Sequence, residues 1–329
     1  ASIVSTTVRL NGSAFTLPAG ASALISSALS FSGTTSSDGG TKTIGWTYDP
    51  AGASLDFLNR NDTLTITYAV KVTDGTADST TQDVTITISG TNDGPVLSSI
   101  VSPAAVVEQA DASVQNLAAL TGTLTVSDKD VGDTLGASIV STTVRLNGSA
   151  FTLPGGASAL TASALSFSGT TSSDGGTKTI GWTYDPSAAN LDFLREGQSL
   201  TITYGIQVGD GVAESATQDL VITITGTNDG PVLSDTTDPV AVVELTDASA
   251  QDMAVLSGSF ALSDRDVGDT LTATVVGSPV VRLNGSVYAG PAALTAEGAF
   301  TITPLTQTSN GGVATSIGWT YDPAGASLD

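Results

Sequence analysis

The nine residues LTITYAVKV, at positions 64–72, alternate between apolar side chains and mostly polar ones. An apolar residue at every second position is typical of a β-strand with one face buried and the other face in water. The pattern returns almost unchanged as LTITYGIQV at positions 200–208, and shorter alternations occur at 84–88, 124–126 and 220–224. These stretches predict antiparallel sheets, and the return of the longest one indicates that the chain builds the same sheet more than once.

Longer repeats surround these strands. The heptapeptide IGWTYDP occurs at residues 44–50, 180–186 and 317–323, so that successive copies start 136 and 137 residues apart. A period of that length corresponds to a whole domain rather than to a solenoid repeat of ~20–50 residues. Turn signals such as Asn11-Gly12, which favours a two-residue hairpin, separate the predicted strands. We therefore expect an all-β chain of tandem antiparallel β-sandwich domains.

The domain boundaries follow from the sequence TNDGPVLS, which occurs at residues 91–98 and 227–234. Its proline removes a backbone donor and so ends the preceding strand. We place boundaries after Asp93 and Asp229, which gives domains at residues 1–93, 94–229 and 230–329. Only the middle domain has the whole pattern, because the first lacks the counterpart of residues 94–136 and the third lacks that of residues 199–225. We expect flanking residues or neighbouring chains to close the two incomplete domains.

The composition excludes several classes of function. The chain has 10 basic and 32 acidic residues, a net charge of −22, which argues against nucleic acid and anionic membrane surfaces as partners and favours cations. It has no Cys and no His, so thiolate zinc sites, cysteine nucleophiles and Ser-His-Asp triads are absent. No apolar stretch reaches the ~18 residues of a membrane helix. We expect a non-enzymatic protein.

Acidic motifs recur around the predicted junctions. Each linker has an Asn-Asp pair, a glutamate follows within VVE, and an Asp-x-Asp-x-Gly-Asp segment comes 35 residues after the linker aspartate. Oxygen ligands in such numbers, with glycine for a tight turn, suit calcium, which takes ~6–8 oxygens. The expected ligands are Asn92, Asp93, Glu108, Asp128, Asp130 and Asp133, and then Asn228, Asp229, Glu244, Asp264, Asp266 and Asp269.

Other interpretations of these acids are open. Asn-Asp-Gly-Pro and Asp-x-x-Gly-Asp are also ordinary turn formers. An EF-hand is disfavoured, because Ile139 stands where its twelfth position requires a bidentate acid. The pairs Asp74 with Asp210 and Asp111 with Asp247 could add ligands, but we interpret them as turn residues.

Three segments carry a resemblance to a known family. They are TGTLTVSDKDVGDTL (121–135), GWTYDPSAANLDFLREGQSLTITYGIQVGDG (181–211) and ATQDLVITITGTNDGPV (216–232). In chain order they resemble the VCBS repeat of giant bacterial RTX-type adhesins. The pairing of a linker acid with an Asp-x-Asp motif also resembles cadherin, in which calcium between domains stiffens the rod.

The resemblance implies an elongated rod of cadherin-like or Ig-like sandwiches. It implies a secreted protein at the bacterial cell surface, exported unfolded by a type I system and folding in external calcium. The ligands that match are Asn92, Asp93, Asp128 and Asp130, with their counterparts in the next copy.

Some repeated residues could serve other chemistry. Trp46, Trp182 and Trp319 could stack on sugars, but the alternation predicts that they pack in the core. The Asn-Gly-Ser sequences at 11–13, 147–149 and 284–286 match glycosylation sequons, yet a hairpin explains them. Asp49 and Asp56 have no surroundings that would make them a glycosidase pair. An isopeptide bond from Lys42 or Lys178 is disfavoured because Thr315 replaces that lysine in the third copy.

These observations predict a calcium-rigidified extender region of a large secreted adhesin, which projects a distal binding module and supports adhesion and biofilm formation. Its partners would be calcium ions and neighbouring repeats, without nucleic acid or membrane insertion. Two alternatives are a self-assembling extracellular fibre or sheath with strand exchange between chains, and a carbohydrate-binding accessory module. Buried tryptophans would count against the last.

Overall fold

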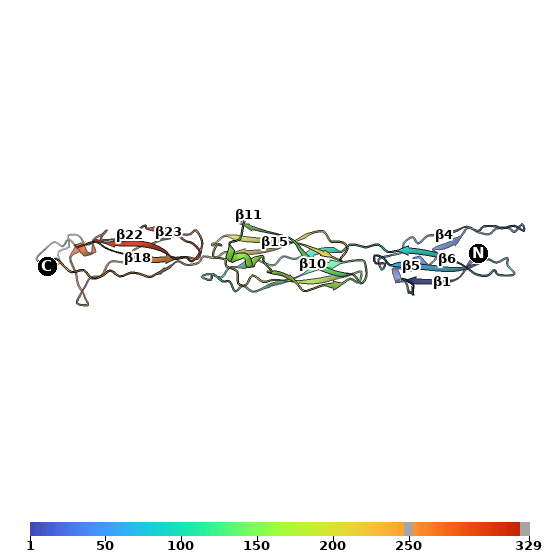
Figure 1. Ribbon diagram of the computed structural model, residues 1–329, viewed down its shortest axis with the longest axis horizontal. Helices are drawn as coiled ribbons and strands as arrows, with labels where there is room; N and C mark the ends of the chain where they lie inside the picture. Colours follow the sequence, from blue (N-terminus) through green and yellow to red (C-terminus); the bar gives the residue numbers. More distant parts are fainter. Residues whose placement is uncertain (247–252, 323–329) are drawn as a thin grey trace.

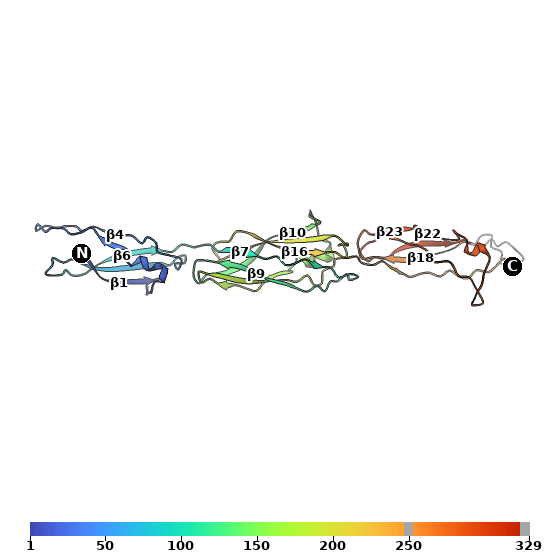
Figure 2. The ribbon, with the colours of Figure 1, turned by 180° about the vertical axis from the view of Figure 1, so that it is seen from behind.

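The computed structural model describes residues 1–246 and 253–322, which form an elongated all-β rod (Figure 1). The chain runs from one end of the rod to the other, as the view from behind also shows (Figure 2). In these described ranges no strand pairing crosses residues 90–95 or 226–231, so the sheets form three successive groups. The boundaries predicted after Asp93 and Asp229 lie inside these two segments. We call the groups the first, middle and third domains.

The middle domain is a sandwich of two sheets. One sheet has the order β11 (Ser149–Ala150), β10 (Thr134–Leu146), β15 (Ser199–Gly209), β16 (Gln218–Thr225) and β8 (Val106–Val107). The other has the order β12 (Leu165–Phe167), β14 (Thr177–Tyr184), β9 (Leu120–Ser127) and β7 (Val96–Ile100). The short strand β13 (Thr171–Ser172) pairs with β10, and the 3-10 helix η2 (Gly155–Leu160) follows β11. All pairs are antiparallel except β8 with β16.

The core of the middle domain follows from the alternation in β15. Its apolar residues from Leu200 to Val208 are all buried, as a strand with one face on the core requires. Tyr184 and Tyr204 both donate their hydroxyl groups to the carbonyl of Leu160, over 3.1 and 2.9 Å. The buried hydroxyls are therefore satisfied, and the two bonds tie the end of η2 to both sheets.

Each buried tryptophan packs against a glycine of the neighbouring strand. Trp182 is 2% exposed, and a Cβ placed on Gly122 of β9 would lie 2.4 Å from its indole ring. Gly258 and Trp319 repeat the arrangement, with the same 2.4 Å separation. The predicted core packing is confirmed for these two tryptophans.

The first domain keeps one sheet whole and only part of the other. The sheet has the order β2 (Ser13–Ala14), β1 (Ser2–Leu10), β5 (Thr63–Lys71) and β6 (Gln82–Ser89). Opposite it lie η1 (Ala19–Leu24) and a two-stranded sheet of β3 (Leu29–Phe31) and β4 (Trp46–Tyr48). Trp46 is 51% exposed, so the prediction of core packing is wrong for this residue. The reason is that no described strand occupies the edge of β4 that β9 occupies beside β14.

The third domain keeps the complementary sheet. That sheet has the order β17 (Val232–Ser234), β18 (Leu256–Ser263), β24 (Thr315–Tyr321) and β22 (Phe300–Thr303). The remaining pairs are β19 (Thr270–Thr272) with β23 (Thr306–Thr308) and β20 (Arg282–Leu283) with β21 (Ser286–Val287), and η3 spans Ala292–Thr295. Its described part buries only five apolar residues, namely Leu262, Leu271, Ala299, Ile317 and Trp319. Within the described residues, no helix has the length and apolarity needed to cross a bilayer.

Acrylamide is expected to quench the fluorescence of Trp46 several-fold more strongly than that of Trp182, because half of Trp46 is exposed and Trp182 is covered. Three variants, each retaining one tryptophan and carrying phenylalanine at the other two positions, allow the comparison at low protein concentration. Equal quenching of all three would contradict the open edge of β4.

Candidate cation sites at the domain junctions

The loop Asp128–Asp133 joins β9 to β10 at the end of the middle domain that meets the first domain. Asp128 is 3% exposed and Asp130 is completely buried. The amide N–H of Asp130 donates to Asp128 Oδ1 over 3.0 Å, and the amide N–H of Asp93 in the linker donates to Asp130 Oδ2 over 2.7 Å. Gly132 has a φ of 97°, which favours glycine, and lets the loop turn back so that Asp133 returns toward Asp128.

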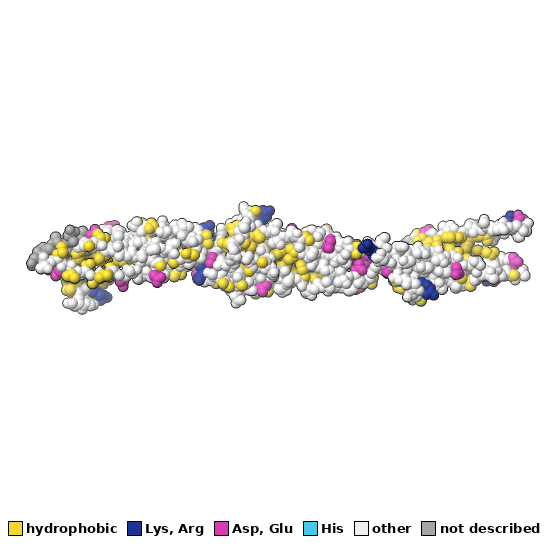
Figure 3. All heavy atoms as spheres, in the orientation of Figure 1, with side chains coloured by type: hydrophobic (Ala, Val, Ile, Leu, Met, Phe, Trp, Pro, Cys, Tyr) yellow, Lys and Arg dark blue, Asp and Glu magenta, His cyan; other side chains and the backbone are white. Residues whose placement is uncertain are grey.

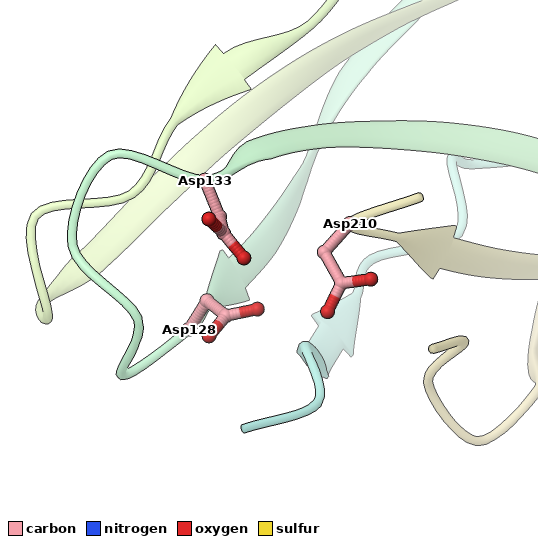
Figure 4. A group of neighbouring side chains, drawn as sticks. All are labelled: Asp128, Asp133 and Asp210. Carbon is pink, nitrogen blue, oxygen red and sulfur yellow. The ribbon is translucent and has the colours of Figure 1, made fainter. Parts of the chain in front are cut away.

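Three carboxylates converge beside this loop (Figure 4). Asp128, Asp133 and Asp210 each offer an oxygen, and the three oxygens lie within 4.8 Å of one another. Asp210 follows β15, and its Oδ2 accepts a hydrogen bond of 2.8 Å from Nδ2 of Asn92 in the linker. The structure therefore brings together the predicted residues Asn92, Asp128 and Asp133 with Asp210, which the sequence interpretation treated as a turn residue.

The first domain reaches the same loop through Asn59. Its Nδ2 donates to the carbonyl of Val131 over 2.9 Å and to Asp133 Oδ1 over 3.2 Å. Its Oδ1 is buried and has no hydrogen-bond partner among the described residues. Asn59 was absent from the predicted ligands because nothing in the LNRND sequence distinguishes it from an ordinary turn residue. Figure 3 shows acidic and basic side chains gathered at this narrow neck of the rod.

The second junction repeats the loop geometry. The amide N–H of Asp266 donates to Asp264 Oδ1 over 2.9 Å, and the amide N–H of Asp229 donates to Asp266 Oδ2 over 2.9 Å. Asp264, Asp266 and Asp229 are all buried. Asn228 donates from Nδ2 to the Asp229 carbonyl over 2.7 Å, as Asn92 does to Asp93 over 2.8 Å. Repeated sequence therefore gives repeated geometry.

The sequence grouped Glu108 with Asp93 at the first junction. In the structure Glu108 lies at the second junction instead. Strand β8 runs parallel to the end of β16, so it delivers Glu108 to the far end of the middle domain. Glu108 is 4% exposed, and its Oε2 accepts a bond of 3.2 Å from the amide N–H of Thr227. The sequence spacing could not show this, because a parallel strand pairing has no local signature.

Glu244, the counterpart of Glu108, is exposed. Among the described residues of the third domain, no strand corresponds to β16, so nothing there delivers Glu244 to a junction. Asp247 lies outside the described residues. Of the predicted ligands, Glu244 is thus the one that the structure places at neither junction.

Two further acids join the second junction. Asp192 is 6% exposed, and its carbonyl accepts a 2.9 Å bond from the amide N–H of Val267 across the junction. Asp111 donates its amide N–H to Asp229 Oδ1, and its own Oδ1 accepts a 2.9 Å bond from the amide of Gly230. The counterpart of Asp192 in the first domain is Asp56, which is exposed. Nothing local distinguishes the two aspartates, since both stand in Leu-Asp-Phe.

The clearest feature of both junctions is a set of buried carboxylate oxygens that no described group satisfies. They are Asp128 Oδ2 and Asp130 Oδ1 at the first junction, and Asp192 Oδ1, Asp229 Oδ2 and Asp266 Oδ1 at the second. A buried polar atom without a partner costs about 1–3 kcal/mol, and more when it is charged. These residues fit a hard cation, which would supply the missing partner to each oxygen.

The pKa values of the junction acids are shifted in the direction expected for buried carboxyl groups that lie close to one another. Burial, with neighbouring acids adding to it, raises the pKa of Glu108 to about 8 and that of Asp130 and Asp266 to about 6. Burial also raises the pKa values of Asp128, Asp133, Asp229 and Asp264. For Asp210, burial alone would raise the pKa, but hydrogen bonds from Ala213, Asn92 and Val212 lower it. In every one of these acids except Asp210, burial therefore disfavours the ionised form relative to a carboxyl group in water.

The two junctions differ in one basic residue. Arg195 stands where the first domain has Asn59, and its Nη1 lies 3.2 Å from Asp269 Oδ1 and 3.3 Å from the Gly268 carbonyl. Arg265 adds a 2.8 Å bond from Nε to Ser113 Oγ. Arg195 thus makes an ion pair across the second junction that the neutral Asn59 does not make at the first.

Of the comparisons with known proteins, the one with solved structures found matches. No protein-family model matches the chain, and no curated protein matches it. Among solved structures, the extracellular cadherin domains 1–5 of protocadherin gamma B2 match 98% of this chain at 12% identity and a TM-score of 0.30. The chain covers 46% of that protein, which is less than half.

Two other structures match less closely. Domains 4–9 of the surface layer protein SbsC match 85% of this chain and 32% of their own, at 14% identity and a TM-score of 0.18. A protein of unknown function from Porphyromonas gingivalis W83 matches 62% of this chain and 76% of its own, at 10% identity and the same TM-score. At these scores the likenesses carry no argument about function.

Proposed function

We propose that the chain is a non-enzymatic extracellular spacer whose domain junctions are stiffened by calcium. The observation that carries the proposal is the set of unsatisfied buried carboxylate oxygens, which recurs at both junctions in the same loop geometry. The Asp130 and Asp266 loops would hold the cation, together with Asp128, Asp133, Asp210 and Asn59 at the first junction and Glu108, Asp192, Asp229 and Asp264 at the second. Calcium would supply positive charge and variable oxygen coordination.

Calcium suits these groups better than other common ions. Zinc in structural sites prefers nitrogen and sulfur ligands, and the chain has neither histidine nor cysteine. Magnesium keeps several waters and takes one or two carboxylates, whereas each junction presents more. A cation bound at the second junction would be shared by Glu108 of the middle domain, Asp229 of the linker and Asp266 of the third domain. It would therefore restrict the angle between the domains.

The resemblance to VCBS repeats supports a spacer role within a large secreted bacterial surface adhesin, where the chain would hold a distal binding module away from the cell and support adhesion and biofilm formation. Near-identical copies suit that role, because a spacer gains length from repetition. A carbohydrate-binding module is less well supported, since Trp182 and Trp319 are buried and present no face to a sugar.

Small-angle scattering of the whole chain tests the proposal. In millimolar calcium we expect a long, narrow distribution of interatomic distances, and after dialysis into chelator a broader distribution with a shorter mean length. Each site would stabilise the fold by about 1.4 kcal/mol at tenfold excess over its dissociation constant.

The double variant Asp130→Asn with Asp266→Asn should behave in calcium as the unaltered chain does in chelator. The double variant Asp83→Asn with Asp219→Asn removes the same charge from exposed strand positions and should respond to calcium normally. An unchanged scattering profile and melting temperature on chelation would refute calcium stiffening.

A further inference from the structure

The turns that face the two junctions have the same backbone. The amide N–H of Asn59 donates to Asp62 Oδ2 over 3.0 Å, and the amide N–H of Arg195 donates to Gln198 Oε1 over 3.0 Å. The glycine that follows β6 or β16 closes each turn, through a bond to the carbonyl of Asp62 over 2.9 Å or of Gln198 over 3.0 Å. Both turns lie wholly within the described residues, so the junctions can be compared here by their side chains alone.

The first residue of each turn reaches the acidic loop of the next domain. Asn59 Nδ2 lies 3.2 Å from Asp133 Oδ1, and Arg195 Nη1 lies 3.2 Å from Asp269 Oδ1. The guanidinium also contacts Gly268, where an added Cβ would lie 3.7 to 3.8 Å from Nη1, Cζ and Nη2. The two side chains thus occupy equivalent places, but the amide is neutral and the guanidinium has a permanent positive charge.

The charges that face each other differ between the two junctions. Burial raises the pKa of Asp133, and the charges of nearby acids, among them Asp62 of the first domain, raise it further. At the second junction the neutral Gln198 stands in place of Asp62, and Arg195 forms an ion pair with Asp269. By its charge, the turn therefore repels the loop at the first junction and attracts it at the second.

A bound cation would therefore change the first junction more than the second. Asp133 belongs to the three carboxylates whose oxygens lie within 4.8 Å of one another, and a cation among them would neutralise the charge that faces the turn. Lys129 is directed elsewhere, since its Nζ lies 4.0 Å from Asp56 and its side chain is 65% exposed. Arg60 is exposed, and the ion pairs of the described residues do not include it. At the second junction, Arg195 supplies a positive charge that no chelator removes.

We propose, as an extension that rests on the proposed calcium function, that Arg195 acts as a fixed cation at the second junction. This junction then stays aligned without calcium, whereas the first junction, with Asn59 at the same place, is aligned only when calcium is bound. Removal of calcium bends the rod at residues 90–95, and the middle and third domains move as one unit. Calcium still binds the buried acids of the second junction, but its alignment does not require the ion.

Distances between pairs of spin labels test the inference, since the chain has no cysteine of its own. One double variant, Thr87→Cys with Thr121→Cys, reports on the first junction through β6 and β9. The other, Thr223→Cys with Ser257→Cys, labels the equivalent positions of β16 and β18 across the second junction. The distance distributions of the whole chain are measured in calcium and in chelator.

In chelator we expect the distribution across the first junction to widen about twofold, because domains joined by a linker with few contacts move relative to each other. The distribution across the second junction should keep its width. Arg195→Asn, which gives the second turn the residue of the first, should make the second distribution widen as the first does. Asn59→Arg should keep the first distribution narrow in chelator. The Arg195 side chain is 40% exposed, so its replacement leaves the core closed.

Two distributions that widen equally in chelator, with or without Arg195, would overturn the inference and leave the proposed calcium stiffening intact. Two distributions that never change on chelation would overturn both. Molar sodium chloride in chelator should widen the second distribution of the unaltered chain, because salt screens a partly exposed ion pair. A distribution that stays narrow in that salt would show that Arg195 acts by packing and not by charge, which would also overturn the inference.

Discussion

Gly122→Val is expected to destabilise the middle domain by about 3 kcal/mol, because overpacking a rigid core site costs 1–3 kcal/mol and sometimes more. The added Cβ would lie 2.4 Å from the indole ring of Trp182, which is itself 2% exposed and has nowhere to move. For a domain of this size, the change corresponds to a fall of roughly 10 °C in the melting temperature of that transition. Differential scanning calorimetry measures it directly.

Two further variants separate this clash from a general effect of valine. Thr123→Val places the same side chain on the exposed neighbour and should change the melting temperature little. Trp182→Phe removes the ring that the new Cβ meets, so it should recover part of the stability lost by Gly122→Val in the double variant. If the Gly122→Val variant had the same melting temperature as the unaltered protein, the indole of Trp182 could be displaced at little cost in free energy.

In metal-free buffer the chain is expected to lose stability as the pH rises from about 5 to about 8. Burial raises the pKa of Glu108 to about 8 from an ordinary value near 4.5, so the folded state holds its proton more tightly than the unfolded state does. The stability is therefore complete below the unfolded pKa and is lost as the pH rises through the folded pKa. For Glu108 the loss is on the order of 3–5 kcal/mol. Asp130 and Asp266 add to it in the same direction at lower pH.

Thermal melts across this pH range measure the slope. Glu108→Gln should remove most of the loss above pH 6, since an amide does not titrate, whereas Glu196→Gln on an exposed turn should leave the slope intact. Added calcium should reverse the trend, because a cation binds the ionised carboxylates. A flat profile in metal-free buffer would mean that these acids are more solvated than their burial indicates.

Part of the site could be read from the sequence. The Asp-x-Asp-x-Gly-Asp segments are local, so glycine and residue alternation were enough to predict that Asp128, Asp130 and Asp133 belong to one loop. Glu108, Asp192 and Asn59 reach the junctions through pairings between distant segments. The parallel contact of β8 with β16 places Glu108 next to Asp229, which lies 121 residues later in the chain. No periodicity within either segment records that contact.

The sequence alone determined the all-β fold and the repeated unit. An apolar residue at every second position and a repeat of about 136 residues can both be read directly from the order of the amino acids. What only the tertiary structure decided is which copy of a repeated residue is buried. Trp46 and Trp182 stand in the same heptapeptide, yet one is 51% exposed and the other 2%. Burial depends on the strand alongside, so identical sequence has different surroundings wherever the neighbouring strand differs.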